Sequence, residues 1–151
     1  MMKTRKPYLI SGGDFTDDRG NLVFNNALSF TKSKIKRFYI IENHKQNFIR
    51  AWHGHKNEGK FFLALSGTFL VCAVRIDNFK KPSTKMKVEK FILTQNRGNV
   101  LHIPKGYANG LKNLTSQNQL IVFSDKSIKD SLNDDYRYDY DYWNVWKENF
   151  R

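Results

Sequence analysis

The sequence predicts an all-β protein, either a sandwich or a small barrel. Its 151 residues include 12 Phe, 7 Tyr and 3 Trp, a composition that favours a well-packed β interior over a helical bundle. Short apolar or alternating runs recur between turn residues at intervals of about eight to twelve residues, as in sandwiches and barrels. No segment before residue 125 has a sustained helical period. The length fits a single domain over residues 1–151.

The expected strands are apolar or alternating runs bounded by turn residues. Gly12 and Gly13, the segment 17–21, and the segment 104–106 carry turn chemistry. The segment 86–93 alternates apolar and charged residues, as a half-exposed strand does. The predicted strands cover residues 8–10, 22–24, 35–42, 48–55, 59–66, 68–76, 86–93, 99–103, 107–113 and 119–124.

The C-terminal segment 126–151 differs from the rest of the chain. It is rich in Asp, but it also contains many Tyr and Trp residues, which a disordered acidic tail would not carry. We therefore expect this short helical or irregular tail to pack back on the barrel, with a helix near residues 127–132.

Composition also limits the partners. The net charge is +12, but the lysines are dispersed and no nucleic-acid motif accompanies them, so we expect a small polyanion as ligand and no nucleic acid. Cys72 lies in an apolar run and is expected to be a buried thiol. No signal core and no apolar stretch of about 18 residues occurs. These features predict a cytoplasmic protein without a membrane partner.

A cationic strand is the main candidate site. Residues 50–56 read Arg-Ala-Trp-His-Gly-His-Lys, and Lys60 opens the next apolar run. The period of two turns His53 and His55 toward the same strand face. Two imidazoles, the Arg50 guanidinium and an ammonium would make a pocket for an anionic ligand. A neutral histidine in it could move a proton near pH 7.

Two spacings place this strand in a known pattern. His53-x-His55-x4-Lys60-x6-Gly67 and Gly98-x5-Pro104-x-Gly106-x2-Asn109-x3-Asn113 follow the two motifs of the cupins. The chain therefore resembles a cupin, a double-stranded β-helix or jelly roll. Metal-binding cupins have Glu at the position of Lys60 and His at that of Asn109. An ammonium offers no lone pair to a cation, so we expect neither a metal nor another cofactor.

Further segments resemble two families of cupins that act on nucleotide-linked keto-sugars. One is the dTDP-4-dehydrorhamnose 3,5-epimerase family, and the other comprises the dTDP-sugar 3,4-ketoisomerases. The resemblance to the epimerases lies in residues 17–20, 50–53, 59–60, 74–77 and 103–110, and that to the ketoisomerases in residues 35–39 and 50–56.

The resemblance implies residue roles. In an epimerase, His53 is the base that removes a proton beside the keto group, and Lys60 stabilises the enolate oxygen. Arg50 and Arg19 approach the sugar and the diphosphate. A ketoisomerase uses His53 and His55 as an acid–base pair, with Tyr39 nearby. Further candidate substrate-binding residues are Asn109 and Asp77.

The function predicted first is epimerisation of a nucleotide-linked 4-keto-6-deoxy sugar at C3, C5 or both, for surface-polysaccharide synthesis, by a homodimer. Two alternatives stay open, a 3,4-ketoisomerase and a non-catalytic cupin that binds sugar nucleotides. The epimerases reprotonate the sugar with a tyrosine on the strand that here contains residues 120–123, where no tyrosine is present. Their base histidine is braced by an aspartate, a role that Asp77 or a tail aspartate would have to take.

Overall fold

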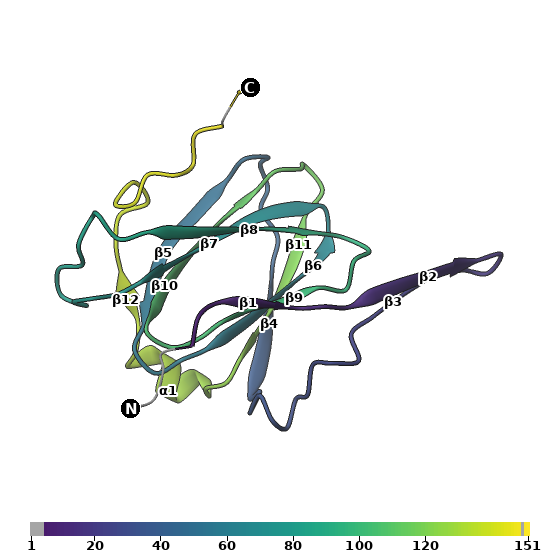
Figure 1. Cartoon of the computed structure of the whole chain (residues 1–151), viewed down its shortest axis with the longest axis horizontal. Helices are drawn as coiled ribbons and strands as arrows, with labels where there is room; N and C mark the ends of the chain where they lie inside the picture. Colours follow the sequence, from purple (N-terminus) through teal and green to yellow (C-terminus); the bar gives the residue numbers. More distant parts are fainter. Residues whose placement is uncertain (1–4, 149) are drawn as a thin grey trace.

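The computed structural model describes residues 5–148 and 150–151. Two five-stranded antiparallel sheets carry most of the chain, and a two-stranded hairpin projects from them (Figure 1). One short helix, α1 (Ile128–Leu132), follows the last long strand. The prediction of an all-β jelly roll with a short helix in its tail is confirmed.

Neighbouring strands in each sheet are mostly distant in sequence, as in a jelly roll. The first sheet has the order β1 (Tyr8–Ile10), β9 (Val100–Ile103), β6 (Lys60–Ser66), β11 (Gln119–Ser124) and β4 (Arg37–Ile41). The second has the order β12 (Tyr136–Arg137), β5 (Ile49–His55), β10 (Tyr107–Asn113), β7 (Thr68–Arg75) and β8 (Val88–Thr94).

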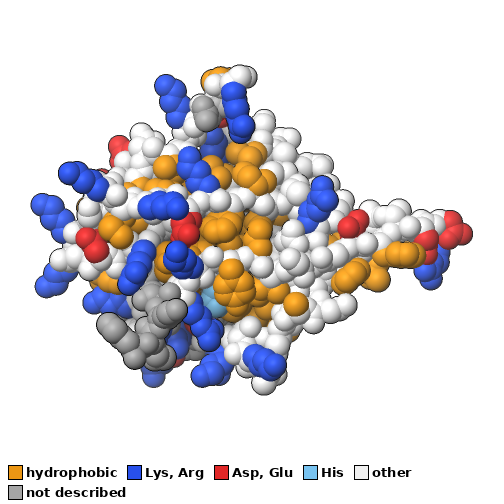
Figure 2. All heavy atoms as spheres, viewed as in Figure 1, with side chains coloured by type: hydrophobic (Ala, Val, Ile, Leu, Met, Phe, Trp, Pro, Cys, Tyr) orange, Lys and Arg blue, Asp and Glu red, His pale blue; other side chains and the backbone are white. Residues whose placement is uncertain are grey.

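The hairpin consists of β2 (Gly13–Asp17) and β3 (Gly20–Phe24), paired from Gly13 and Phe24 to Asp17 and Gly20. The sequence predicted only the second of these strands, because the two glycines before Asp14 indicate a turn. Apolar side chains are visible along the hairpin in Figure 2, and Phe15 and Leu22 are exposed.

The main core lies between the two sheets. Alternate residues of each strand point inward, and those from both sheets form one buried cluster that includes Phe62, Phe69, Val71, Leu101, Leu111, Leu120 and Val122. The apolar core ends where polar side chains of β5, β6 and β10 face the space between the sheets. The site described below lies at this position.

A second cluster lies on the outer side of β5 and β10, where the tail packs. Trp52 contacts Trp143 and Trp146, with ring centroids 5.3 and 5.2 Å apart. A Cβ added at Gly110 would lie 2.8 Å from the Ala51 Cβ and 3.0 Å from the ring of Trp146. Only glycine therefore lets the tail approach β10 this closely.

The tail also extends the second sheet. Ser127 caps α1 by accepting a hydrogen bond from the Asp130 N–H, and the chain then returns as β12 along the edge of β5, with Tyr136 opposite Gly54 and Arg137 opposite His53. Within the described residues, no helix has the length and apolar character needed to cross a membrane.

Candidate functional site

A cavity of about 250 Å³ opens between the two sheets. β4 and β6 form one wall, and β5 and β10 form the other. Its lining brings together five of the residues predicted from the sequence, with three apolar neighbours: Tyr39, Arg50, His53, Lys60 and Asn109, and Ile41, Phe62 and Leu111.

Arg50 and His53 share this cavity although they are three positions apart on the strand, a spacing that places side chains on opposite faces of a regular strand. The pairing of β5 with β10 shifts register between Asn109 and Leu111, so that Asn109 pairs with His53 and Leu111 with Arg50. Asn109 and Leu111 are two residues apart and face the same side. The irregularity, a β-bulge in its effect, brings Arg50 and His53 to that side as well.

Lys60 is a buried cation on the wall opposite His53. The residue is 8% exposed, and its Nζ lies 5.6 Å from the centroid of the Tyr39 ring. Over residues 5–148 and 150–151, no carboxylate lies within ion-pair distance of this ammonium. A buried charge without a counter-ion is costly, so Lys60 favours an anionic ligand or a negative charge that develops on one.

His53 is held in its neutral form. Burial and the nearby charge of Lys60 lower its pKa, and the carboxylate of Asp135 opposes this shift. Asp135 enters with β12, and its Oδ1 lies 3.9 Å from His53 Nδ1. Arg137 holds the same carboxylate through an Nε–Oδ2 contact of 3.0 Å. A neutral imidazole at pH 7 can accept a proton.

His55 lies on the same strand but does not line the cavity. It is 5% exposed, and burial followed by the charge of Lys60 lowers its pKa. Its Nδ1 is 2.6 Å from the main-chain oxygen of Asp134 and 3.3 Å from Oε2 of Glu58. A carbonyl oxygen accepts only, so Nδ1 carries the hydrogen and Nε2 has the lone pair in the neutral ring. This Nε2 is buried and has no partner among the described residues.

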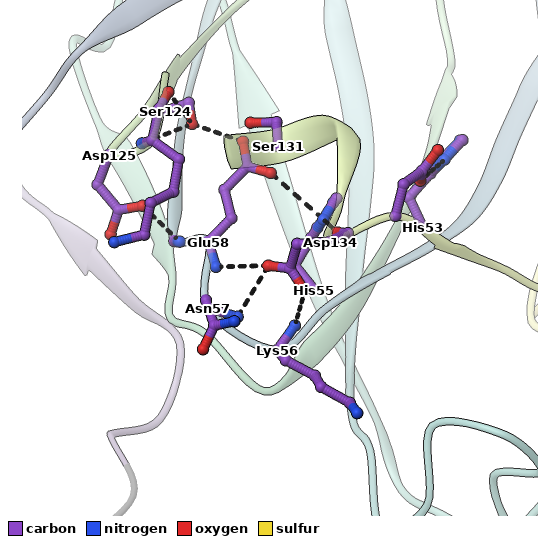
Figure 3. Close-up of polar contacts among 12 residues, drawn as sticks. His53, His55, Lys56, Asn57, Glu58, Ser124, Asp125, Ser131 and Asp134 are labelled. Carbon is purple, nitrogen blue, oxygen red and sulfur yellow. Dashed lines mark hydrogen bonds and ion pairs between the residues drawn. The ribbon is translucent and has the colours of Figure 1, made fainter. Parts of the chain in front are cut away.

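The turn between the two histidines and Lys60 is fixed by polar contacts from the tail (Figure 3). The carboxylate of Asp134 accepts hydrogen bonds from the main-chain N–H groups of Lys56, Asn57 and Glu58, at 2.7, 2.8 and 3.0 Å. The buried side chain of Glu58 accepts hydrogen bonds from Arg37 and Ser124. These contacts thus fix the position of the end of β5 relative to the start of β6.

The other predicted site residues lie elsewhere. Arg19 lies in the turn between β2 and β3, where it is exposed and paired with Asp17. Asp77 follows β7 and accepts hydrogen bonds from the main-chain N–H groups of Asn78 and Ser83, as a turn residue does. The structure brings neither into the cavity of its own chain.

The structure adds residues that sequence reasoning did not assign. Glu58 and Asp134 support His55, Asp135 approaches His53, and Asn43 accepts a hydrogen bond from Arg50. The only sequence signal for the aspartates was the acidic tail. No group of three or more His, Cys, Asp or Glu residues in the described parts of the chain could hold a metal ion.

Charge substitutions around His53 should move its pKa in opposite directions. Lys60→Met removes the positive charge and should raise the pKa of both His53 and His55. Asp135→Asn removes the opposing negative charge and should lower the pKa of His53 alone. NMR titration of the imidazole carbons checks both. Unchanged titration of His53 in both variants would contradict the proposed electrostatics, and His102, whose pKa burial lowers to about 4, serves as the internal control.

The chain matches one family model and is similar to several solved structures. A family model described as FdtA: WxcM-like, C-terminal matches residues 6–148. A sequence search of curated proteins gives no significant match. Among solved structures, the WlaRB TDP-quinovose 3,4-ketoisomerase from Campylobacter jejuni has a TM-score of 0.67 at 22% identity, covering 93% of this chain and 98% of that protein.

Two further structures illustrate the range of similar proteins. A mutant of the QdtA 3,4-ketoisomerase from Thermoanaerobacterium thermosaccharolyticum, in complex with TDP-4-keto-6-deoxyglucose, has a TM-score of 0.66 at 19% identity, covering 93% of each chain. The dTDP-4-dehydrorhamnose 3,5-epimerase from Bacillus anthracis has a TM-score of 0.69 at 20% identity, covering 85% of this chain and 76% of that one. The resemblance inferred from the sequence is confirmed, and the chain belongs to the FdtA family, of the WxcM-like C-terminal type.

Proposed function

We propose that this protein is an isomerase of a nucleotide-linked 4-keto-6-deoxy sugar, without a metal or other cofactor. The observation that carries the proposal is the cavity in which a neutral His53 faces a buried, uncompensated Lys60 across the two sheets. Similar solved structures bind TDP or a TDP-linked keto-sugar, which supports this class of substrate. We also propose that the protein acts in the cytoplasm, in the synthesis of surface-polysaccharide precursors.

The chemistry begins at the carbon beside the ketone. His53 removes the proton at C3 through Nε2, the ring nitrogen that is not directed at Asp135. The C–H electron pair forms a C3–C4 double bond, and the carbonyl electrons move to O4. The negative charge on O4 develops next to the Lys60 ammonium, which stabilises it. Arg50 and Asn109 bind polar groups of the substrate.

We favour 3,4-ketoisomerisation over epimerisation as the outcome. In a ketoisomerase, O4 gains a proton, the C3 hydroxyl loses one, and protonated His53 returns its proton to C4, so the carbonyl moves to C3. Tyr39, which lines the same cavity, supplies a further proton-transfer group, since its hydroxyl can give a proton to O4 and take one from the C3 hydroxyl. On β11, Leu120 and Val122 belong to the apolar core, which supports a site without the epimerase tyrosine.

The extent of the structural match supports the same choice. The match to the WlaRB ketoisomerase covers 93% of this chain, and the match to the Bacillus anthracis epimerase covers 85% of it. Epimerisation remains the second candidate because Tyr39 projects from the wall opposite His53. A phenol there could return a proton to the other face of the sugar ring.

Incubation with TDP-4-keto-6-deoxyglucose in D2O tests the function. A ketoisomerase moves the carbonyl ¹³C signal from C4 to C3, and deuterium appears at C4 only to the extent that protonated His53 exchanges with solvent before it returns the proton. An epimerase keeps the carbonyl at C4 and exchanges the hydrogens at C3 or C5. Thermal stabilisation by thymidine diphosphate without either change would reject the enzymatic proposal and support a cupin that only binds the nucleotide.

We also propose that the protein is a homodimer built through the hairpin. Phe15 and Leu22 of the hairpin are exposed, as are Phe38 and Ile40 on the outer face of β4. Apolar surfaces of this kind favour association. Because the hairpin that carries Arg19 projects away from the two sheets (Figure 1), a role for Arg19 in substrate binding requires the cavity of the partner subunit.

Charged substitutions on the hairpin should therefore dissociate the protein. We expect Phe15→Asp with Leu22→Asp to convert a dimer to a monomer in light-scattering chromatography, with activity falling at the same time. Leu132→Asp is the matched control, since Leu132 is a similarly exposed apolar residue on α1 (72% against 62% for Leu22). A monomeric wild-type protein, or a double variant that stays dimeric, would contradict the proposal.

A further inference from the structure

Three buried asparagines form a hydrogen-bonded network at the Arg50 end of the cavity. Asn118 binds the main chain of Asn43 in both directions, accepting from its N–H at 2.8 Å and donating to its carbonyl at 3.0 Å. Asn43 Nδ2 donates to Asn113 Oδ1 at 2.9 Å. Asn113 Nδ2 in turn donates to two main-chain oxygens, those of Lys45 and Thr115.

This network fixes which end of the Asn43 amide faces Arg50. Asn113 Nδ2 is committed to two carbonyls, so its Oδ1 accepts, and the NH2 group of Asn43 must point to it. The Asn43 oxygen is therefore left for Arg50, whose Nε lies 2.6 Å from it. A flipped amide would place donor against donor at Arg50 and acceptor against acceptor at Asn113, and the second mismatch, between two buried side chains, is costly.

Arg50 is held from a second side as well. Its Cζ lies 5.7 Å from the centroid of the Phe48 ring, a distance at which a cation interacts with the ring. No ion pair with a carboxylate forms at Arg50 in the part of the chain that the structure describes. The Nε–H is used by Asn43, and the two terminal nitrogens remain for a ligand.

We propose that Asn43 is a positioning residue, which orients the Arg50 guanidinium so that its two terminal nitrogens form a fork for a phosphate or diphosphate group. This inference rests on the proposed function, since it assigns the anionic part of a nucleotide-linked sugar to Arg50. A planar guanidinium held through Nε binds an oxyanion with two parallel hydrogen bonds. Because the orientation is fixed before binding, less side-chain entropy is lost when the anion arrives.

A double-mutant cycle with thymidine diphosphate as the probe tests the inference. We expect Arg50→Ala to weaken binding about a hundredfold and Asn43→Ala about tenfold. In the Arg50→Ala background, Asn43→Ala should change the affinity by less than about twofold, because Asn43 acts only through Arg50. Equal losses in both backgrounds, or no loss from Asn43→Ala, overturn the inference.

A readout without ligand separates orientation from folding. The Nε–H signal of Arg50 in ¹⁵N NMR should be protected from solvent exchange in the wild type and in Asn118→Ala, and should lose protection in Asn43→Ala. Asn118→Ala is the control, since it removes buried hydrogen bonds of the network without removing the Arg50 contact. If Asn43→Ala does not fold, the smaller polar variant Asn43→Ser replaces it.

Turnover of TDP-4-keto-6-deoxyglucose distinguishes this inference from the proposed function. If Asn43→Ala weakens binding only when Arg50 is present and no turnover is detected, the positioning role is supported and the proposed reaction is rejected. If turnover is detected but Asn43→Ala weakens binding equally in both backgrounds, the positioning role is rejected and the proposed reaction is supported. A wild-type protein that binds neither thymidine diphosphate nor pyrophosphate at millimolar concentration overturns the inference, whatever its activity.

Discussion

Replacing His53 by asparagine is expected to lower kcat by about three orders of magnitude, because the variant loses the only histidine that lines the cavity in the described chain. Asparagine keeps a similar size and polarity at a partly exposed position. The unfolding free energy should therefore stay within about 0.5 kcal/mol of the wild type. Turnover of the keto-sugar followed by NMR, together with urea denaturation, measures both effects.

His44→Asn is the matched control, since it makes the same replacement at an exposed histidine in a loop. Full activity in this variant and loss in His53→Asn would assign the effect to the cavity. Retention of more than about a tenth of the activity in His53→Asn would show that another group removes the proton. The wild-type rate should fall as the pH drops below the lowered pKa of His53, since the protonated ring cannot act as a base.

Asp134→Ala should produce the largest loss of stability, about 3–4 kcal/mol. The buried carboxylate accepts three main-chain hydrogen bonds from the turn between β5 and β6. Alanine would leave all three N–H groups without this partner. Asp134→Asn keeps one acceptor oxygen and should lose about half as much. Urea denaturation with an unchanged m value checks these differences.

Asp130→Ala, on the exposed side of α1, controls for the loss of an acidic residue from the same segment. Asp134→Ala should also reduce activity, because His55 and Lys60 flank the turn that Asp134 holds. A loss below about 1 kcal/mol in this variant would mean that water replaces the carboxylate at the three N–H groups.

The strands were largely predictable because most have a local signal. The segment 107–113 was expected as a strand and is β10 without change of bounds, since glycine and proline residues mark its start and alternate residues enter the core. β12 has only two residues and exists because it pairs with β5, far away in the sequence. No local pattern in the tail encodes that pairing, so sequence reasoning placed a helix near residues 127–132 but no strand after it.

The cavity was predictable only where residue type and motif spacing agree. His53, Lys60 and Asn109 stand at motif positions and do line it. Arg50 lines it because of a register shift between β5 and β10, which the alternation of a regular strand does not reveal. The support of the two histidines by Asp134 and Asp135 depends on where the tail returns, and this follows from tertiary packing.

The contact between Gly110 and Trp146 has a consequence for how this fold can change over time. A larger residue at position 110 would collide with the indole and with the Cβ of Ala51. Any relative that carries one must therefore have lost bulk at position 146 or moved its C-terminal segment, and must also have made room at position 51. Substitutions at position 110 should then accompany changes at both neighbours, and the neighbours should change first. Few orders of substitution therefore keep the tail, which carries Asp135, packed on β10.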